Sequence, residues 1–143
     1  MNIVQIDKTN IKSIAEFVVI NKNSCEDLAT KFKGTLSRQE VNKQWIKFII
    51  RSDAIIKSIV IDCQNNKITG ITFSGTLDIT YADLVALFGE SKQYYERYDD
   101  ANEFFFKNDT VDNYSIKCFM LNNDKQKNNW QNEKLGNISI HLP

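Results

Sequence analysis

The chain has 143 residues and a formal net charge of zero, because 18 basic residues balance 18 acidic ones. A general nucleic-acid binder needs a positive excess to displace counterions, so we expect no nucleic-acid partner. Hydrophobic residues make up 42% of the chain and aromatic residues 11%, which is too apolar for a disordered segment and enough for the core of one domain. No apolar run approaches the ~18 residues of a membrane span, so we expect no membrane partner.

The chain has three cysteines, Cys25, Cys63 and Cys118, which are widely spaced and form no C-x-x-C motif. An odd number at such spacing is typical of reduced core thiols rather than of a disulfide scaffold. The opening residues also lack the basic region and the uninterrupted apolar stretch of a secretory signal. We therefore expect a cytoplasmic protein with free thiols. A Cys25–Cys63 or a Cys63–Cys118 disulfide is the alternative.

The apolar pattern near the start predicts a strand and two helices. NIVQID is typical of a short strand. TNIKSIAEFVVI places apolar residues at helical spacing, although its β-branched end leaves a strand as the alternative. In SCEDLATKFKGTLS, Ser24 followed by Asp27 is a capping-box pattern, and Gly34 is typical of a helix end.

From residue 38 to 75 the apolar period changes to two, which predicts strands. NKQWIKFIIRSD alternates Ile46 and Phe48 on one face with Trp45 and Lys47 on the other. KSIVIDCQNNKITGITFSG predicts a β-hairpin, because its Asn-Asn centre tolerates the left-handed conformations of a tight turn.

The second half repeats this order. Thr80 is predicted to cap a helix in TYADLVALFGES, and Gly89 to end it. SKQYYERY and NEFFFKND are predicted strands around a polar turn, and YSIKCFMLN and NEKLGNISIHL are predicted to pair across a polar loop at 122–133.

A helix, a glycine, two extended segments and a hairpin therefore occur twice, which indicates an internal duplication. We expect a single domain over residues 1–143, with one pseudo-repeat over about 9–75 and a second over about 76–143. The alternative is chance, because short matches between helix-glycine-strand segments are common.

Tandem helix-then-antiparallel-strand units that carry the short pattern Asp-Leu-x-x-x-Phe-Gly resemble the β-lactamase-inhibitory-protein-like fold, which the SmpA/OmlA-type outer-membrane assembly lipoproteins share. The resemblance covers residues 9–142 and implies an α+β fold: a curved antiparallel β-sheet with short helices packed on one face, built from two tandem repeats. The open face would be free to bind a protein. Because the chain lacks the lipoprotein cysteine and the paired cysteines of secreted inhibitors, we carry over no binding residue.

No group of residues predicts catalysis. The sole histidine, His141, alternates with Ile140 and Leu142 and has no local nucleophile or carboxylate partner. The acidic residues between 99 and 112 lack the central glycine of a calcium loop, and the five glycines form no phosphate-binding motif. We therefore expect no enzyme, no cofactor and no metal site.

Adjacent aromatic residues in KQYYERY and EFFFK cannot all enter one core, because strand side chains alternate between the two faces of a sheet. If Phe104 and Phe106 face the helices, then Phe105 lies on the other face. Glu103 and Lys107 are expected beside it.

Trp45 and Lys47 lie on that second face by the same argument, as does one of the two tyrosines at 94 and 95. Rings beside charges on a solvent-facing sheet are typical of protein-binding surfaces, whereas the alternatives are a face that is covered or rings that only stabilise the sheet. Trp130 in the polar loop is a second candidate anchor, or packs back over the sheet edge. The predicted protein-binding residues are Trp45, Lys47, Tyr94, Tyr95, Arg97, Tyr98, Asp100, Glu103, Phe105 and Trp130.

These expectations favour a non-catalytic protein-binding protein. The most concrete form is a bacterial immunity protein or inhibitor that neutralises a cognate toxin or enzyme by occluding its active site. The neutral charge favours a non-nuclease target, or a local acidic patch at 99–112. The alternatives are a small-ligand-binding or enzymatic α+β domain with a pocket enclosed by the curved sheet, and a homodimer that buries the aromatic face.

Overall fold

The computed structural model describes residues 3–96, 101–107, 113–121, 125 and 127–143, without the side chains of residues 94–96. Its centre is one antiparallel sheet of eight strands in the order β1-β2-β3-β4-β8-β7-β6-β5. The strands are β1 (Thr35–Glu40), β2 (Trp45–Arg51), β3 (Ile56–Gln64), β4 (Lys67–Gly75), β5 (Lys92–Glu96), β6 (Ala101–Phe106), β7 (Ser115–Leu121) and β8 (Asn137–His141). The helices are α1 (Ile11–Ile20), α2 (Cys25–Thr30), α3 (Tyr81–Phe88) and the 3₁₀ helix η1 (Trp130–Asn132). The α+β class and the antiparallel sheet are confirmed.

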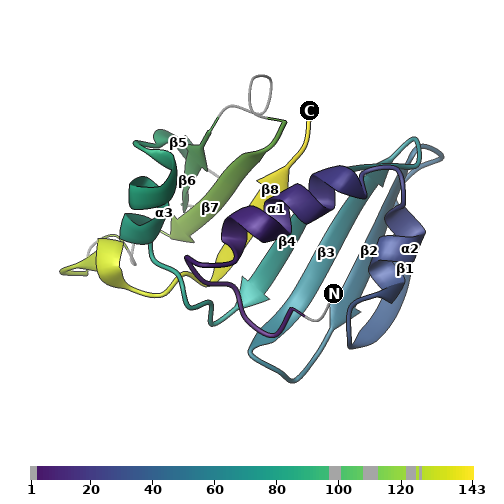
Figure 1. Cartoon of the computed structure of the whole chain (residues 1–143), viewed down its shortest axis with the longest axis horizontal. Helices are drawn as coiled ribbons and strands as arrows, with labels where there is room; N and C mark the ends of the chain where they lie inside the picture. The colour runs from purple at the N-terminus through teal and green to yellow at the C-terminus, as the bar shows by residue number, and fades with distance from the viewer. Residues whose placement is uncertain (1–2, 97–100, 108–112, 122–124, 126) are drawn as a thin grey trace.

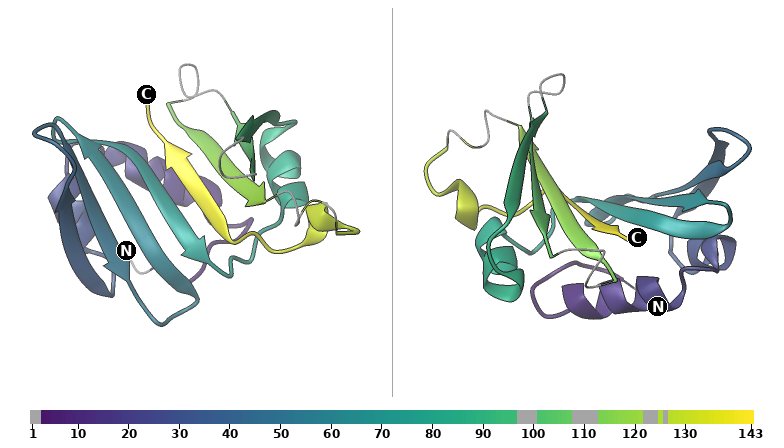
Figure 2. Two further views of the ribbon diagram at one scale, coloured as in Figure 1. Left: turned by 180° about the vertical axis from the view of Figure 1, so that it is seen from behind. Right: turned by 90° about the horizontal axis from the view of Figure 1, so that it is seen from above.

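The sheet bends near its middle, where β8 meets β7 (Figure 1). Figure 2 shows strands β5–β7 rising steeply from the plane of β1–β4, with α1, α2 and α3 outside the angle. α2 packs against β2 and β3, whereas α3 packs against β6 and η1. The helix-free face of both halves therefore lines the inside of the angle, and we call it the inner face.

One row of apolar side chains runs across the sheet beneath the helices. Ile61 is opposite Ile71, Ile71 is opposite Ile140, Ile140 is opposite Ile116, and Ile116 is opposite Phe106. All five side chains are fully buried, and burial of each contributes roughly 1.5–3 kcal/mol. Because the row crosses from β3 to β6 without a break, the two halves share one core.

The two short helices begin differently. At α3, the Thr80 hydroxyl accepts the Asp83 N–H and the Asp83 carboxylate accepts the Thr80 N–H, both at 3.1 Å, which confirms the predicted cap. Gly89 ends α3 with a φ of 87°, as predicted. Ser24 makes no side-chain capping bond at α2, so the capping box predicted there is wrong.

Gly34 is not the end of α2, which stops at Thr30. Its φ is 141°, and a Cβ at this position would lie 2.5 Å from the carbonyl oxygen of Arg51. The glycine is therefore required by the close approach of the chain to β2 and not by a helix terminus.

The predicted opening strand does not form over the described residues 3–6. An isolated bridge joins Asp7 to Asp78. The Asp7 carboxylate instead holds the turn that precedes α1, because it accepts the Thr9 and Asn10 N–H groups at 2.8 and 3.0 Å. The Thr9 hydroxyl donates to the same carboxylate, and this bond, with the backbone bonds, lowers the pKa of Asp7.

Cys25 and Cys63 form a disulfide that ties α2 to β3, with their Cα atoms 6.3 Å apart. Cys118 is free and buried. The expectation of three reduced thiols is therefore wrong, because the pairing depends on where α2 packs on the sheet. Disulfides persist mainly in oxidising compartments, so the argument from reduced thiols to a cytoplasmic protein no longer holds.

The two halves of the chain share an order of elements. The strands β1–β4 follow α2, and the strands β5–β8 follow α3. The two sets meet in the sheet where β4 pairs with β8. The helix α1 precedes both sets and has no counterpart among the described residues of the second half.

Candidate functional site

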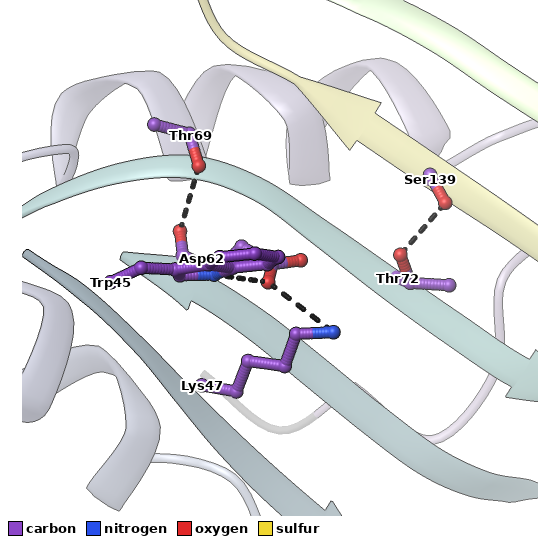
Figure 3. Close-up of polar contacts among 6 residues, drawn as sticks. All are labelled: Trp45, Lys47, Asp62, Thr69, Thr72 and Ser139. Atoms are coloured by element: carbon purple, nitrogen blue, oxygen red, sulfur yellow. Dashed lines mark hydrogen bonds and ion pairs between the residues drawn. The ribbon is translucent and has the colours of Figure 1, made fainter. Parts of the chain in front are cut away.

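In the first half of the inner face, Trp45, Lys47 and Asp62 form one group, which we call the Trp45 cluster (Figure 3). The indole Nε1 of Trp45 donates a hydrogen bond to Asp62 Oδ1 at 3.0 Å. Lys47 Nζ lies 3.9 Å from the same oxygen and 5.1 Å from the centre of the indole ring. The carboxylate and the ammonium group therefore hold the indole in one orientation.

A second group, Phe105, Glu103 and Lys117, lies on β6 and β7, and we call it the Phe105 cluster. Lys117 Nζ is 3.8 Å from Glu103 Oε1 and 5.6 Å from the centre of the Phe105 ring. Lys117 is directly opposite Phe105, just as Lys47 is directly opposite Asp62. Each half of the inner face thus carries one aromatic ring, one lysine and one carboxylate that meet across two adjacent strands.

Short hydroxyl side chains lie between the clusters. The Thr72 and Ser139 hydroxyl oxygens, on the paired strands β4 and β8, are 2.8 Å apart (Figure 3). Nearer the Trp45 cluster, the Thr69 hydroxyl donates to the main-chain oxygen of Asp62 at 3.3 Å. Because these hydroxyl side chains are short, the aromatic rings on either side project further from the sheet than the side chains between them do.

Four of the predicted binding residues lie in the two clusters: Trp45, Lys47, Glu103 and Phe105. The register of β5 pairs Tyr94 with Glu103 and Tyr95 with Asn102, which places the position of Tyr94 in the row of the Phe105 cluster. Their side chains are outside the description. Arg97, Tyr98 and Asp100 lie outside the described residues.

Trp130 does not lie on the inner face. Its ring centre is 4.9 Å from that of Tyr81 on α3 and 5.7 Å from that of the buried Phe104. The loop therefore packs back against the helix side of the sheet, which is the alternative that the sequence left open, and a binding role for Trp130 stays a prediction.

Lys107 also departs from expectation. Its φ of 63° turns the chain at the end of β6, and its Nζ lies 4.3 Å from the ring centre of the buried Tyr114. Lys107 is therefore not beside Phe105, because strand alternation stops at the turn.

The described residues contain no group of three or more His, Cys, Asp or Glu side chains placed to hold a metal ion. Burial raises the pKa of the Cys118 thiol to about 12, which keeps it protonated and unreactive. Among the helices in the described part of the chain, none is long and apolar enough to cross a membrane.

Sequence reasoning missed three side chains of the inner face: Asp62, Lys117 and Phe119. Each lies between two buried positions of its strand, as Asp62 does between Ile61 and Cys63. Strand alternation therefore places them opposite the core. The same alternation that locates Trp45 is sufficient to find them, although the apolar rows of β3 and β7 are the stronger signal.

No protein-family model and no curated protein matches the chain. The fold is similar to that of an extracellular protein containing a SCP domain from Bacillus anthracis str. Ames, with a TM-score of 0.51 and 10% sequence identity. The match covers 85% of this chain and 43% of that protein, so the chain spans less than half of its length. At this identity the similarity shows the fold alone.

Proposed function

We propose that the protein is a non-catalytic binding protein that grips another protein with its inner face. The observation that carries this proposal is the pair of clusters, each with an aromatic ring held between strands by charged neighbours. Rigid rings beside lysines are typical of interface hot spots, because little side-chain freedom is lost when they are covered. Their position on the helix-free side leaves both rings accessible to one partner.

The charges of the clusters favour a neutral or weakly charged partner surface. Each cluster pairs one lysine with one carboxylate, Lys47 with Asp62 and Lys117 with Glu103. A nucleic acid would need a surplus of lysine or arginine, and a basic nuclease a surplus of carboxylate. Neither surplus is present in the clusters, so we propose a target that is not a nuclease.

The most concrete form of the proposal is a bacterial immunity protein or inhibitor that occludes the active site of a cognate toxin or enzyme. A bent sheet with rings on both arms suits a partner that projects into the angle. We also propose that the two halves arose by duplication of a helix-and-four-strand unit, which the shared order of elements supports.

The test is affinity capture with tagged protein from a lysate of the source organism, followed by an activity assay of the captured protein. The baits are the wild type, Trp45→Ala, Phe105→Ala and the control Ile20→Ala. Ile20 is an apolar residue on α1 with 81% exposure, on the helix side. We expect one captured protein that binds to the wild type and to Ile20→Ala but not to either cluster variant. We also expect the wild type to inhibit the activity of this protein.

The proposal fails if the captured protein is retained equally by Trp45→Ala and Phe105→Ala while circular dichroism shows both variants folded. It also fails if the partner is bound without any loss of its activity, which would leave binding without inhibition. A two-fold dimer that buries both rings, visible by light scattering and abolished by either variant, would instead support the homodimer.

A further inference from the structure

The strands β7 and β8 separate at the edge of the inner face. They pair only where Ser115–Lys117 lies opposite Ser139–His141. Beyond this point the side chain of Asn137 replaces the backbone pairing. Its amide donates to the Phe119 carbonyl at 3.0 Å and accepts the Phe119 N–H at 3.1 Å. The amide satisfies the backbone of Phe119 and holds the two strands apart.

A pocket of about 300 Å³ lies at this separation. Its apolar wall consists of Phe119, Met120, Leu121, Trp130 and Leu135. This volume is at the lower limit for a small-molecule site, so it suits one large apolar group better than a whole ligand.

The pocket is continuous with the inner face. Phe119 is opposite Glu103 of the Phe105 cluster and Leu121 is opposite Ala101, so both face the inner side of the sheet. Phe119 is 44% exposed and Leu121 49% exposed. An apolar group that enters the pocket would cover these two side chains, and the rest of its molecule would lie over the Phe105 cluster.

Charged side chains surround the pocket, with Lys127, Lys134 and Glu133 among its lining residues. Lys134 Nζ also lies 3.7 Å from Asp78, in a pair whose side chains are both more than half exposed. Such an exposed pair is weak and screened, so Lys134 is available to a second carboxylate. Among the described lining residues, two are thus basic and one is acidic.

We propose that this pocket receives one large apolar side chain of the partner, flanked by a carboxylate that Lys134 attracts. This proposal rests on the proposed function, because it assigns an anchor to the same partner. Hot-spot side chains enter well-packed pockets at interfaces, and the size and apolar wall of this pocket, with Lys134 at its rim, define the chemistry of the group it takes.

The test uses the Trp45→Phe variant, in which Trp130 is the sole tryptophan and reports on the pocket by its fluorescence. The probes are N-acetyl-leucine, which carries a carboxylate, and the neutral N-acetyl-leucinamide. We expect N-acetyl-leucine to shift the Trp130 emission with saturation, and to bind about two- to fivefold more tightly than the amide at low salt. Phe119→Ala and Leu121→Ala should each weaken binding at least about fivefold, whereas Leu36→Ala, on the exposed strand β1, should not.

Three results would overturn the proposal. The first is no saturable change with N-acetyl-leucine, and the second is a change that persists in Phe119→Ala and Leu121→Ala. The third is binding of decanoate more than about a hundredfold tighter than that of N-acetyl-leucine, which would indicate a lipid ligand instead. Because no partner is needed, a failure here is distinct from failure of the inner face, which the capture experiment with Trp45→Ala and Phe105→Ala detects.

Discussion

The two halves of the sheet contain the same order of elements but are stabilised differently. In the first half, the Cys25–Cys63 disulfide fastens the short α2 to β3. In the second half, α3 has a complete capping box, and its Tyr81 packs 4.9 Å from the ring centre of Phe104. A covalent bond in one half and a capped helix with aromatic packing in the other thus serve the same purpose, which is to hold a short helix on the sheet.

Each cluster contains a ring, a lysine and a carboxylate, but the lysine and the carboxylate exchange strands between the two halves. In the Trp45 cluster the lysine shares β2 with the ring, and the carboxylate comes from β3. In the Phe105 cluster the carboxylate shares β6 with the ring, and the lysine comes from β7. Equivalent positions thus carry opposite charges, and each cluster pairs one positive with one negative group.

The largest expected effect is the difference in reactivity of the Cys118 thiol between native and unfolded protein. Burial raises the pKa of the Cys118 thiol from its ordinary 9.0 to about 12, which lowers its thiolate fraction about a thousandfold at neutral pH. We expect native protein to react with DTNB more than about a thousandfold slower than free cysteine, and to react fully once unfolded in guanidinium. A fast native reaction of one thiol would show that Cys118 is accessible.

The disulfide should dominate the stability of the first half. It joins residues 38 apart, and the loop-entropy relation gives roughly 4 kcal/mol for a loop of this length. The double variant Cys25→Ser, Cys63→Ser should lower the free energy of unfolding by about 3–4 kcal/mol, measured by urea denaturation. Adding TCEP to the wild type should have a similar effect and should leave the double variant unchanged.

Removing the hydroxyl group before each short helix should affect stability at α3 but not at α2. Thr80→Ala removes a capping bond at α3 and should lower the free energy of unfolding by about 1 kcal/mol. Ser24→Ala is the matched control, because Ser24 makes no side-chain capping bond at α2, and its expected effect is within about 0.5 kcal/mol. Equal effects in thermal unfolding would contradict the difference between the helix starts.

The smallest expected contrast is between the carboxylates of the two clusters. Asp62→Asn alters a carboxylate that accepts the indole N–H as well as facing a lysine, and should lower stability by up to about 1 kcal/mol. Glu103→Gln alters a partly exposed ion pair, and should change stability by less than about 0.5 kcal/mol. Urea denaturation measures both effects, and a larger loss for Glu103→Gln than for Asp62→Asn would contradict a stabilising role for the indole hydrogen bond.

The sequence predicts those features that depend on strand alternation and on helix capping. The burial of Phe104 and Phe106, the capping box at Thr80 and the position of Trp45 beside Lys47 all follow from residues close in the chain. Each depends on a period of two or on a three-residue spacing, so no knowledge of distant contacts was needed.

Features set by distant contacts could not be predicted in this way. Cys25 meets Cys63 only because α2 packs on β3, and Trp130 meets Phe104 only because its loop folds back over α3. The separation held open by Asn137 likewise depends on where β7 leaves β8. Such contacts arise from the packing of whole elements, and the sequence pattern near each residue carries no sign of them.

The central claim is that the inner face binds the partner through both clusters. Isothermal titration calorimetry of the captured partner with Trp45→Ala, Phe105→Ala and Ile20→Ala tests it most directly. We predict that each cluster variant weakens binding at least about thirtyfold, as hot-spot residues do, and that Ile20→Ala changes it less than about twofold. Wild-type affinity in both folded cluster variants would contradict the claim.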